Sequence, residues 1–567
     1  MSNMMNNIDK KYNTYDAIVI GSGITGGWAA KELCENGLKT LLLERGRDVK
    51  HIVDYPTASL NPWDFKYRLN NTTAEINANP LRSSISSEED KHFYLADKEQ
   101  PYIQETAFQW VRGDQVGGRS LVWGRQCYRW SDLNFEANLK DGHGVDWPIR
   151  YRDLAPWYDY VERFIGVSGR KENLSHLPDG IFLPPMDLNC IEQHLAESIK
   201  KNDENRLLTI ARVANLTRGW KDRGPCQYRN LCSRGCPFGG YFSSNSATLP
   251  AATATGNLTL RPFSIVKHLI YDDATRKVTG VRVIDRNTLE EVEFYAKVIF
   301  LNASTIASTA ILLNSVSERF PNGLGNDSGQ LGHNLMDHHS AAGASGNYEG
   351  YKDQYYKGRR PAGFLIPRFR NLADGENLGF LRGYNIQGYG ERENWKDKSV
   401  TLSGFGSSFK NDIIKPGPWT VWMAGWGECL PNFNNGISLD RELKDPYGMP
   451  LIKINFSFGE NEKRMMNDIR NSSAEILQKA NFINVQDFCY KKPGGATVHE
   501  MGTARMGKDP KTSVLNGNNQ IHNVKNVFVT DGSCMTSSGC QNPSLTYMAL
   551  TARACRFAVD ELKKGNL

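Results

Sequence analysis

The 567-residue sequence has no apolar run long enough to cross a membrane. Its longest apolar stretch, residues 298–313, is interrupted by polar residues such as Asn302 and Ser304, whereas a membrane-spanning helix needs about 20 apolar residues. Residues 1–15 are polar and rich in asparagine, and they lack the apolar core of a secretory signal peptide. These absences predict a protein without a direct membrane span that, left to itself, stays in the cytoplasm.

Neither sign of charge dominates, because 68 Lys and Arg residues stand against 62 Asp and Glu residues and no long basic block occurs. This pattern predicts a solvated surface and no nucleic-acid partner. Cysteine is scarce, with 11 residues that are mostly isolated, which indicates reduced thiols rather than a disulfide framework. With 40% hydrophobic and 23% charged residues, the composition is that of a soluble globular protein, and the length predicts more than one compact unit.

The first ordered elements read as a strand at residues 15–21, a helix at 25–36 and a strand at 39–44. This order is a βαβ unit, which implies a parallel sheet with helices packed on it. Further along, residues 258–260, 278–285 and 291–301 alternate like antiparallel strands of a β-meander, and a helix is predicted at 304–314. Residues 332–492 are rich in glycine, aromatic residues and short strand-like runs (364–369, 419–424 and 451–456), which indicates a second, sheet-based unit.

A glycine motif, GSGITG at residues 21–26, lies directly between the first strand and the helix. In this context the first glycine makes the tight turn, the second lets a pyrophosphate approach the backbone, and the third allows close helix–strand packing. An acidic residue at the end of the second strand suits the hydroxyl groups of a ribose. The residues assigned to the dinucleotide here are Gly21, Gly23, Ile24, Thr25, Gly26, Glu44 and Arg45. The motif alone does not separate FAD from NAD.

Four further stretches carry a family resemblance: VGGRSLVW at 116–123, LGHNLMDH at 331–338, HEMGTARMG at 499–507, and VTDGS at 529–533 with QNPSLT at 541–546. Together with the glycine motif they resemble, in the same order, the glucose-methanol-choline (GMC) flavin oxidoreductases. The likeness covers nearly the whole chain. It implies an α/β fold with a Rossmann-like FAD-binding domain and a second, sheet-based (α+β) substrate-binding domain.

The resemblance implies that His499 removes the proton of a substrate hydroxyl while a hydride passes to the flavin, with Asn542 as its partner. An imidazole with an ordinary pKa of about 6.5 is suited to take that proton at neutral pH. The resemblance further assigns to FAD the residues Gly117, Gly118, Ser120, Val266, Asp531, Gly532, Asn542 and Pro543. No histidine follows the paired glycines, so we expect non-covalent FAD. Arg125 and Gln126 are candidate sugar contacts, with exposed surface side chains as the equal alternative.

Three histidines, His333, His338 and His339, could be metal ligands together with Asp337. We favour a structural role for them, since the resemblance implies one for this stretch.

Three cysteines, Cys226, Cys232 and Cys236, form the one thiol cluster, and a proline follows the last of them. Zinc fits poorly, because it usually takes four ligands with a CxxC pair and no histidine lies between residues 221 and 250. The arrangement resembles the branch of the family with bacterial FAD glucose and gluconate dehydrogenases and glucoside 3-dehydrogenases, which implies a [3Fe-4S] cluster. Three buried thiols without metal are the alternative.

We therefore expect an FAD-binding domain at 1–330 that includes the cysteine loop at 221–250, a substrate-binding domain at 331–490, and a C-terminal return at 491–567. The expected reaction is oxidation of a carbohydrate hydroxyl to a ketone, and the branch resemblance implies C3 of glucosides or disaccharides as first choice. The same resemblance implies that electrons pass to a cytochrome c and that a small partner subunit with an export signal brings the enzyme to the periplasm. The alternatives are a pyranose-oxidase-like enzyme that reduces oxygen, a non-catalytic flavin-binding subunit, and an NAD-dependent dehydrogenase.

Overall fold

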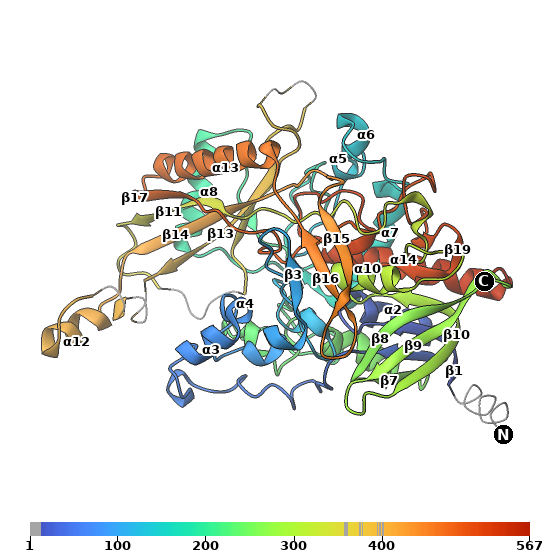
Figure 1. Ribbon diagram of the computed structural model, residues 1–567. Coiled ribbons are helices and arrows are strands. Elements are labelled where there is room, and N and C mark those ends of the chain that lie inside the picture. The colour runs from blue at the N-terminus through green and yellow to red at the C-terminus, as the bar shows by residue number, and fades with distance from the viewer. Residues whose placement is uncertain are drawn as a thin grey trace.

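The computed structural model describes residues 13–355, 361–373, 376, 378–393, 395, 398–399 and 402–567. Most of the polar N-terminal stretch, from which we expect no export signal, therefore lies outside the described residues. Figure 1 shows two large sheets side by side, one near the chain termini and one beneath the long helix α13 (Glu460–Lys479). No described helix combines the length and the apolar character that a membrane span requires.

The sheet near the termini, here called the nucleotide sheet, confirms the predicted βαβ unit. Its first elements are β1 (Thr14–Ile20), α2 (Ile24–Glu35) and β2 (Thr40–Leu43). Five strands run parallel in the order β19 (Val524–Val529), β10 (Glu291–Leu301), β1, β2 and β7 (Leu258–Arg261), and β18 (Gln520–Ile521) joins β19 antiparallel. All four residues of β2 are buried, as expected for a parallel strand covered on both faces.

One part of the strand prediction is wrong. Residues 258–261 are a parallel neighbour of β2, not the first strand of an antiparallel meander. The true antiparallel partners are β8 (Ser264–Asp272), which the sequence analysis missed, and β9 (Lys277–Asp285), which also pairs with β10. A run of four residues is too short for its pattern to reveal the direction of pairing, so only the tertiary register settles it.

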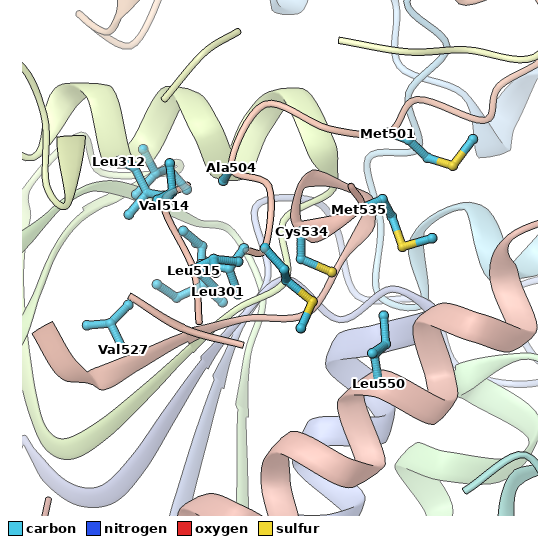
Figure 2. Close-up of a cluster of buried hydrophobic side chains, with 14 of the residues drawn as sticks. Leu301, Leu312, Met501, Ala504, Val514, Leu515, Val527, Cys534, Met535 and Leu550 are labelled. Carbon is cyan, nitrogen blue, oxygen red and sulfur yellow. The ribbon is translucent and has the colours of Figure 1, made fainter. Parts of the chain in front are cut away.

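The C-terminal segment returns to the nucleotide sheet and fills its core. Helix α14 (Ser544–Lys563) contacts α2 and α7 (Tyr151–Ile165). Figure 2 shows how residues of this return pack beside β10, α10 (Thr305–Asn314) and α14; labelled are Leu301, Leu312, Met501, Ala504, Val514, Leu515, Val527, Cys534, Met535 and Leu550. The return therefore places residues from both ends of the chain around one core.

The second sheet, here called the antiparallel sheet, has six strands. Their order is β17 (Ile483–Cys489), β11 (Ala342–Tyr348), β14 (Trp419–Gly427), β13 (Tyr384–Arg392), β12 (Phe364–Ile366) and β6 (Thr209–Ile210). Helices α13 and α8 (Cys190–Asn202) cover one face with apolar side chains. The predicted run at 451–456 is instead β16 (Pro450–Asn455), which pairs with β15 (Gly436–Lys444) and with β3 (Tyr102–Gln104) in a separate small sheet.

The shorter elements connect these layers. They are α3 (Thr73–Ala78), α4 (Pro80–Ser83), α5 (Asp132–Phe135), α6 (Ala137–Asp141), α9 (Leu249–Ala254), α12 (Gly406–Ile414), β4 (Val167–Ser168) and β5 (Phe182–Leu183). Helix α12 projects away from the body of the molecule (Figure 1). The α/β fold class is confirmed, and the exact domain boundaries stay a prediction. Strand β6, from the first part of the chain, belongs to the antiparallel sheet, and α8 packs on that sheet.

Candidate active site

A cavity of about 650 Å³ lies between the nucleotide sheet and the antiparallel sheet. Most of the residues assigned to cofactor or substrate line it: Gly21, Gly23, Ile24, Thr25, Glu44, Arg45, Gly118, Ser120, Arg125, Gln126, Val266, His499, Asp531, Gly532, Asn542 and Pro543. Gly26, Gly117 and the three clustered cysteines do not line it. The structure thus brings together groups separated by more than 500 residues.

The glycine motif is shaped for a phosphate group. Gly21 has a φ of +91°, and a Cβ there would lie 2.4 Å from the Asn302 carbonyl oxygen. A Cβ on Gly26 would lie 1.7 Å from the Gly21 carbonyl oxygen, so Gly26 serves helix packing. A Cβ on Gly23 would meet no atom within 4 Å, since this glycine faces the open cavity at the start of α2. The residues present therefore fit a pyrophosphate at the helix N-terminus.

Glu44 follows β2 and is held firmly at the cavity wall. Its Oε2 accepts hydrogen bonds from the Ser22 backbone nitrogen at 3.0 Å and the Ser22 hydroxyl at 2.5 Å, and its Oε1 accepts one from the Gly46 nitrogen at 2.9 Å. Burial raises the pKa of the Glu44 carboxyl. A carboxylate in this place suits the ribose of a dinucleotide, and Arg45 lines the cavity beside it.

The paired glycines, Gly117 and Gly118, begin a loop that contacts both the glycine motif and the segment around His499. The Gly117 nitrogen donates to the Ser22 hydroxyl at 2.9 Å, and the Ser120 hydroxyl donates to the Gly117 carbonyl at 2.6 Å. Arg119, which the sequence analysis did not single out, pairs with Glu500 at 2.8 Å between Nη2 and Oε2. This ion pair fixes the neighbour of His499 to the loop that borders the cofactor space.

His499 and Asn542, 43 residues apart, meet in the cavity with 3.5 Å between His499 Nε2 and Asn542 Nδ2. The His499 backbone nitrogen donates to Asp337 Oδ1 at 3.1 Å, which fixes the segment. Burial raises the pKa of Asp337 to about 7. Desolvation lowers the pKa of His499 well below its ordinary value, and the neighbouring His338 and Arg119 lower it further. A neutral imidazole at this position is able to accept a proton.

His338 determines which nitrogen of His499 is free. His338 Nε2 lies 2.5 Å from the Gly539 carbonyl oxygen, which only accepts, so this nitrogen carries the hydrogen. Burial lowers the pKa of His338 to about 4, so the ring is neutral at neutral pH and its Nδ1 is an acceptor. It lies 2.8 Å from His499 Nδ1, which must therefore be the donor. The free lone pair of His499 is consequently on Nε2, the atom that faces Asn542.

Gln387 on β13 orients the other member of the pair. Its Nε2 donates to Asn542 Oδ1 at 2.7 Å and to Asn385 Oδ1 at 3.1 Å. With its oxygen occupied, Asn542 turns its amide nitrogen toward His499 and the cavity. Neither Gln387 nor His338 was expected to act at the site. The likeness of residues 331–338 to the family motif located His338 but gave no sign of this contact.

The three histidines at residues 333–339 have different surroundings in the structure. Among the described residues, no group of three or more His, Cys, Asp or Glu side chains is placed to hold a metal ion. His333 bonds the Phe433 carbonyl at 2.8 Å and stacks on that ring, and His339 is buried against Phe458. A structural role describes His333 and His339, whereas His338 contacts the candidate base.

Two candidate sugar contacts, Arg125 and Gln126, line the cavity. Arg125 is buried, with its guanidinium 5.5 Å from the centre of the Tyr241 ring and within 3.4 Å of the Pro361 carbonyl oxygen. Gln126 Oε1 accepts a hydrogen bond from the Tyr128 hydroxyl. Arg125 is therefore no exposed surface side chain, and sugar binding by either residue stays a prediction.

The cysteine loop lies outside the cavity. Cys226 Sγ accepts from the Tyr228 nitrogen at 3.5 Å and Cys236 Sγ from the Gly240 nitrogen at 3.3 Å, and all three thiols, Cys232 included, are half-buried. Burial, with the two neighbouring thiols, raises the pKa of Cys226 to about 11. The three thiols lie near one another, but among the described residues no group of three or more such side chains is arranged to hold a metal ion.

The chain is similar to known proteins over most of its length. The sequence profile of the GMC oxidoreductases matches residues 15–340 and 431–551. The fructose dehydrogenase large subunit of Gluconobacter japonicus is 25% identical, with 97% of this chain and 98% of that protein covered. The 2-methyl-1,2-propanediol dehydrogenase of Mycolicibacterium austroafricanum is 27% identical, with 95% and 94% covered.

A solved structure of the formate oxidase of Aspergillus oryzae shares the fold, with a TM-score of 0.61, 15% identity, and 97% of this chain and 99% of that chain covered. The matched ranges cover the nucleotide sheet but only β6 and β17 of the antiparallel sheet, and they contain the positions of His499 and Asn542. This chain therefore belongs to the GMC oxidoreductase family and is an FAD-dependent enzyme that acts on alcohol groups.

Proposed function

We propose that this enzyme is a sugar dehydrogenase that oxidises a secondary hydroxyl of a carbohydrate to a ketone, with C3 of a glucoside or disaccharide as first choice. The observation that carries the proposal is the unprotonated Nε2 of His499 beside the Asn542 amide, in the cavity that also contains the glycine motif. The similarity to fructose dehydrogenase supports a sugar substrate. The choice of C3 rests on the branch resemblance of the sequence.

The residues of this chain supply proton transfer and orientation. Gly21, Gly23 and Glu44 would hold FAD, which would supply the acceptor for the hydride of the substrate carbon. His499 Nε2 takes the hydroxyl proton, and the Asn542 amide donates to the same oxygen and holds the alcohol in register. The lowered pKa of His499 keeps the base unprotonated below the ordinary histidine range, so the acid limb of the pH profile should lie below pH 6.5.

The electron acceptor, the partner and the location are also proposals. The relative from Gluconobacter is named a large subunit, which supports a smaller partner subunit. The export signal on that subunit, the cytochrome c acceptor and the work in the periplasm rest on the branch resemblance of the sequence. The [3Fe-4S] cluster rests on the spacing of Cys226, Cys232 and Cys236 and on the branch resemblance of the sequence. Because the structure does not gather these thiols as ligands, we assign no step to a cluster. Non-covalent FAD is consistent with His499 being the one histidine among the described cavity residues.

A single experiment tests the function. The absorbance spectrum of the anaerobically purified protein is recorded before and after addition of glucose, a methyl glucoside and a disaccharide. We expect flavin bands that one of these sugars bleaches, and a broad iron–sulfur shoulder if the cysteines bind a cluster. Bleaching by 2-methyl-1,2-propanediol but by no sugar would instead indicate a diol dehydrogenase. The similarity to the enzyme of Mycolicibacterium austroafricanum favours this second candidate function. Fast peroxide formation on admitting air would indicate an oxidase.

The matched variant pair is His499→Ala and His333→Ala. His499→Ala should retain FAD and lose flavin reduction by about 10²–10⁴-fold, because only the proton acceptor is removed. His333 lies outside the cavity against Phe433, so its variant should reduce the flavin at the wild-type rate. Near-normal flavin reduction by His499→Ala would refute the proposed mechanism.

A further inference from the structure

A row of four aromatic rings crosses the antiparallel sheet from the cavity to the sheet edge. Tyr389 on β13 stands directly opposite Trp422 on β14, with ring centres 5.6 Å apart and planes at 30°. Trp422 and Phe488 on β17 follow at 6.0 Å and 10°, and Phe488 and Tyr490 at 5.0 Å and 14°. We call these four residues the aromatic row. At such separations nearly parallel rings are offset and overlap only in part, so portions of their faces are left for another molecule.

The sequence builds this row through strand alternation and small residues. Val421 and Met423, the neighbours of Trp422, point into the core under α13, so Trp422 lies on the opposite face. Strand β11 runs between Trp422 and Phe488 and presents there only Ser345 and Gly343. A Cβ on Gly343 would lie 2.8 Å from Phe488 Cζ. The missing side chain lets Phe488 lie across β11 and approach Trp422.

The row starts beside the catalytic pair. Gln387, which orients Asn542, precedes Tyr389 by two residues and lies on the same face of β13. Tyr389 and Trp422 line the cavity, Phe488 is half-buried, and Tyr490 is 60% exposed. From β13 to the edge strand β17 the row spans three strand spacings, about 14 Å. The surface thus continues from the reacting position to solvent and is wider than one sugar ring.

We propose that the aromatic row is the binding site for the further pyranose rings of an oligosaccharide substrate whose first ring reacts at His499. The inference rests on the proposed function and names its substrate class. A pyranose ring has C–H faces that suit the electron-rich faces of aromatic rings, and hydroxyl groups at its rim that need polar partners. Such partners stand on the same face at Ser345 and Gln486, which are paired across β11 and β17. This mixture of rings, hydroxyl and amide groups favours a sugar over a hydrocarbon.

The test compares substrates that differ only in length: methyl glucoside, cellobiose and cellotriose. We expect kcat/KM to rise with length in the wild type. The measured quantity is the ratio of kcat/KM for cellotriose to kcat/KM for methyl glucoside. In the double variant Phe488→Ala/Tyr490→Ala this ratio should fall about two- to tenfold, because one or two ring contacts are lost. The fall should come from a higher KM for cellotriose. Phe488→Tyr keeps a ring and should restore the ratio. Phe405→Ala, at a 91% exposed ring beside α12, is the matched control and should leave the ratio as it is.

Binding is measured separately by calorimetry with cellotriose in the FAD-loaded His499→Ala protein, in which turnover is stopped. We expect the further changes at Phe488 and Tyr490 to weaken this binding by the same factor. An unchanged ratio and unchanged binding would refute the sugar site, as would a preference for octyl glucoside over cellobiose that the double variant abolishes. Ring-dependent cellotriose binding without flavin reduction by any sugar would retain the site and refute the proposed function.

Discussion

At the residue scale, the candidate base is defined by hydrogen bonds that no sequence pattern reveals. His338 and His499 are 161 residues apart, yet the contact between their Nδ1 atoms leaves Nε2 of His499 as the atom with the free lone pair. Gln387 does the same for Asn542, since it occupies the amide oxygen. Both supporting residues are buried and contact no reacting atom, so they position the pair that does the chemistry.

The role of His338 leads to a prediction about two substitutions. His338→Leu removes the acceptor for His499 Nδ1 and leaves a donor unsatisfied, so we expect flavin reduction to slow about 10- to 100-fold. Because His338 is itself neutral above its pKa of about 4, its removal takes away no positive charge in this pH range, so the acid limb of the pH profile should still lie below pH 6.5. His338→Asn keeps an acceptor near the position of Nδ1 and should recover much of the rate. Stopped-flow flavin reduction from pH 5 to 8 measures both effects, and equal behaviour of the two variants would contradict the assigned role.

At the element scale, two glycines of the turn between β1 and α2 have different roles, one in packing and one in cofactor binding. Gly26 faces the backbone of Gly21, whereas Gly23 faces open space in the cavity. Gly23→Val should therefore fold normally but lose FAD affinity at least about tenfold, because the new side chain occupies the place of the pyrophosphate. Gly26→Ala should lower the melting temperature of the apoprotein. Flavin titration and thermal unfolding of the apo forms test this pair, and a destabilised Gly23→Val apoprotein would show that Gly23 serves packing as well.

The same scale shows what local sequence predicts well. The strand, glycine turn, helix and second strand at residues 14–43 were predicted within one or two residues, because apolar runs and glycine punctuation coincide there. The direction of β7 and the existence of β8 were missed, since residues 258–272 mix polar and apolar residues and owe their pairing to β2 and β9. The aromatic row was also missed, since it joins residues from β13, β14 and the end of the β17 segment.

At the scale of the whole molecule, the site depends on the return of the chain to its first sheet. Residues 499–507 and 529–546 reach the cavity because the segment around them fills the core beside β10, α10 and α14 (Figure 2). Family motifs in the sequence located these residues, and the same motifs predicted FAD as the cofactor and the fold class. The substrate was not predictable in the same way, because it depends on side chains of the antiparallel sheet that no motif marks.

Burial of histidines in this core gives a prediction for the stability of the whole enzyme. His339 is 1% exposed, and neither ring nitrogen has a hydrogen-bond partner among the described residues. Burial lowers the pKa of His339 to about 3, so the unfolded chain binds this proton more readily than the folded enzyme. The contribution to stability is complete above the unfolded pKa of about 6.5 and falls as the pH drops from there toward 3, by about 1.4 kcal/mol per pH unit.

We therefore expect His339→Leu to flatten the acid side of the stability profile. Between pH 6.5 and 5 the melting temperature of the wild type should fall more steeply than that of the variant, by roughly 1–2 °C per pH unit for a chain of this size. Phe458→Leu, at the ring that packs on His339, disturbs the packing without removing the titrating group and should keep the wild-type slope. Scanning calorimetry across this range measures the difference. Parallel slopes for wild type and His339→Leu would show that His339 takes up its proton without opening the fold.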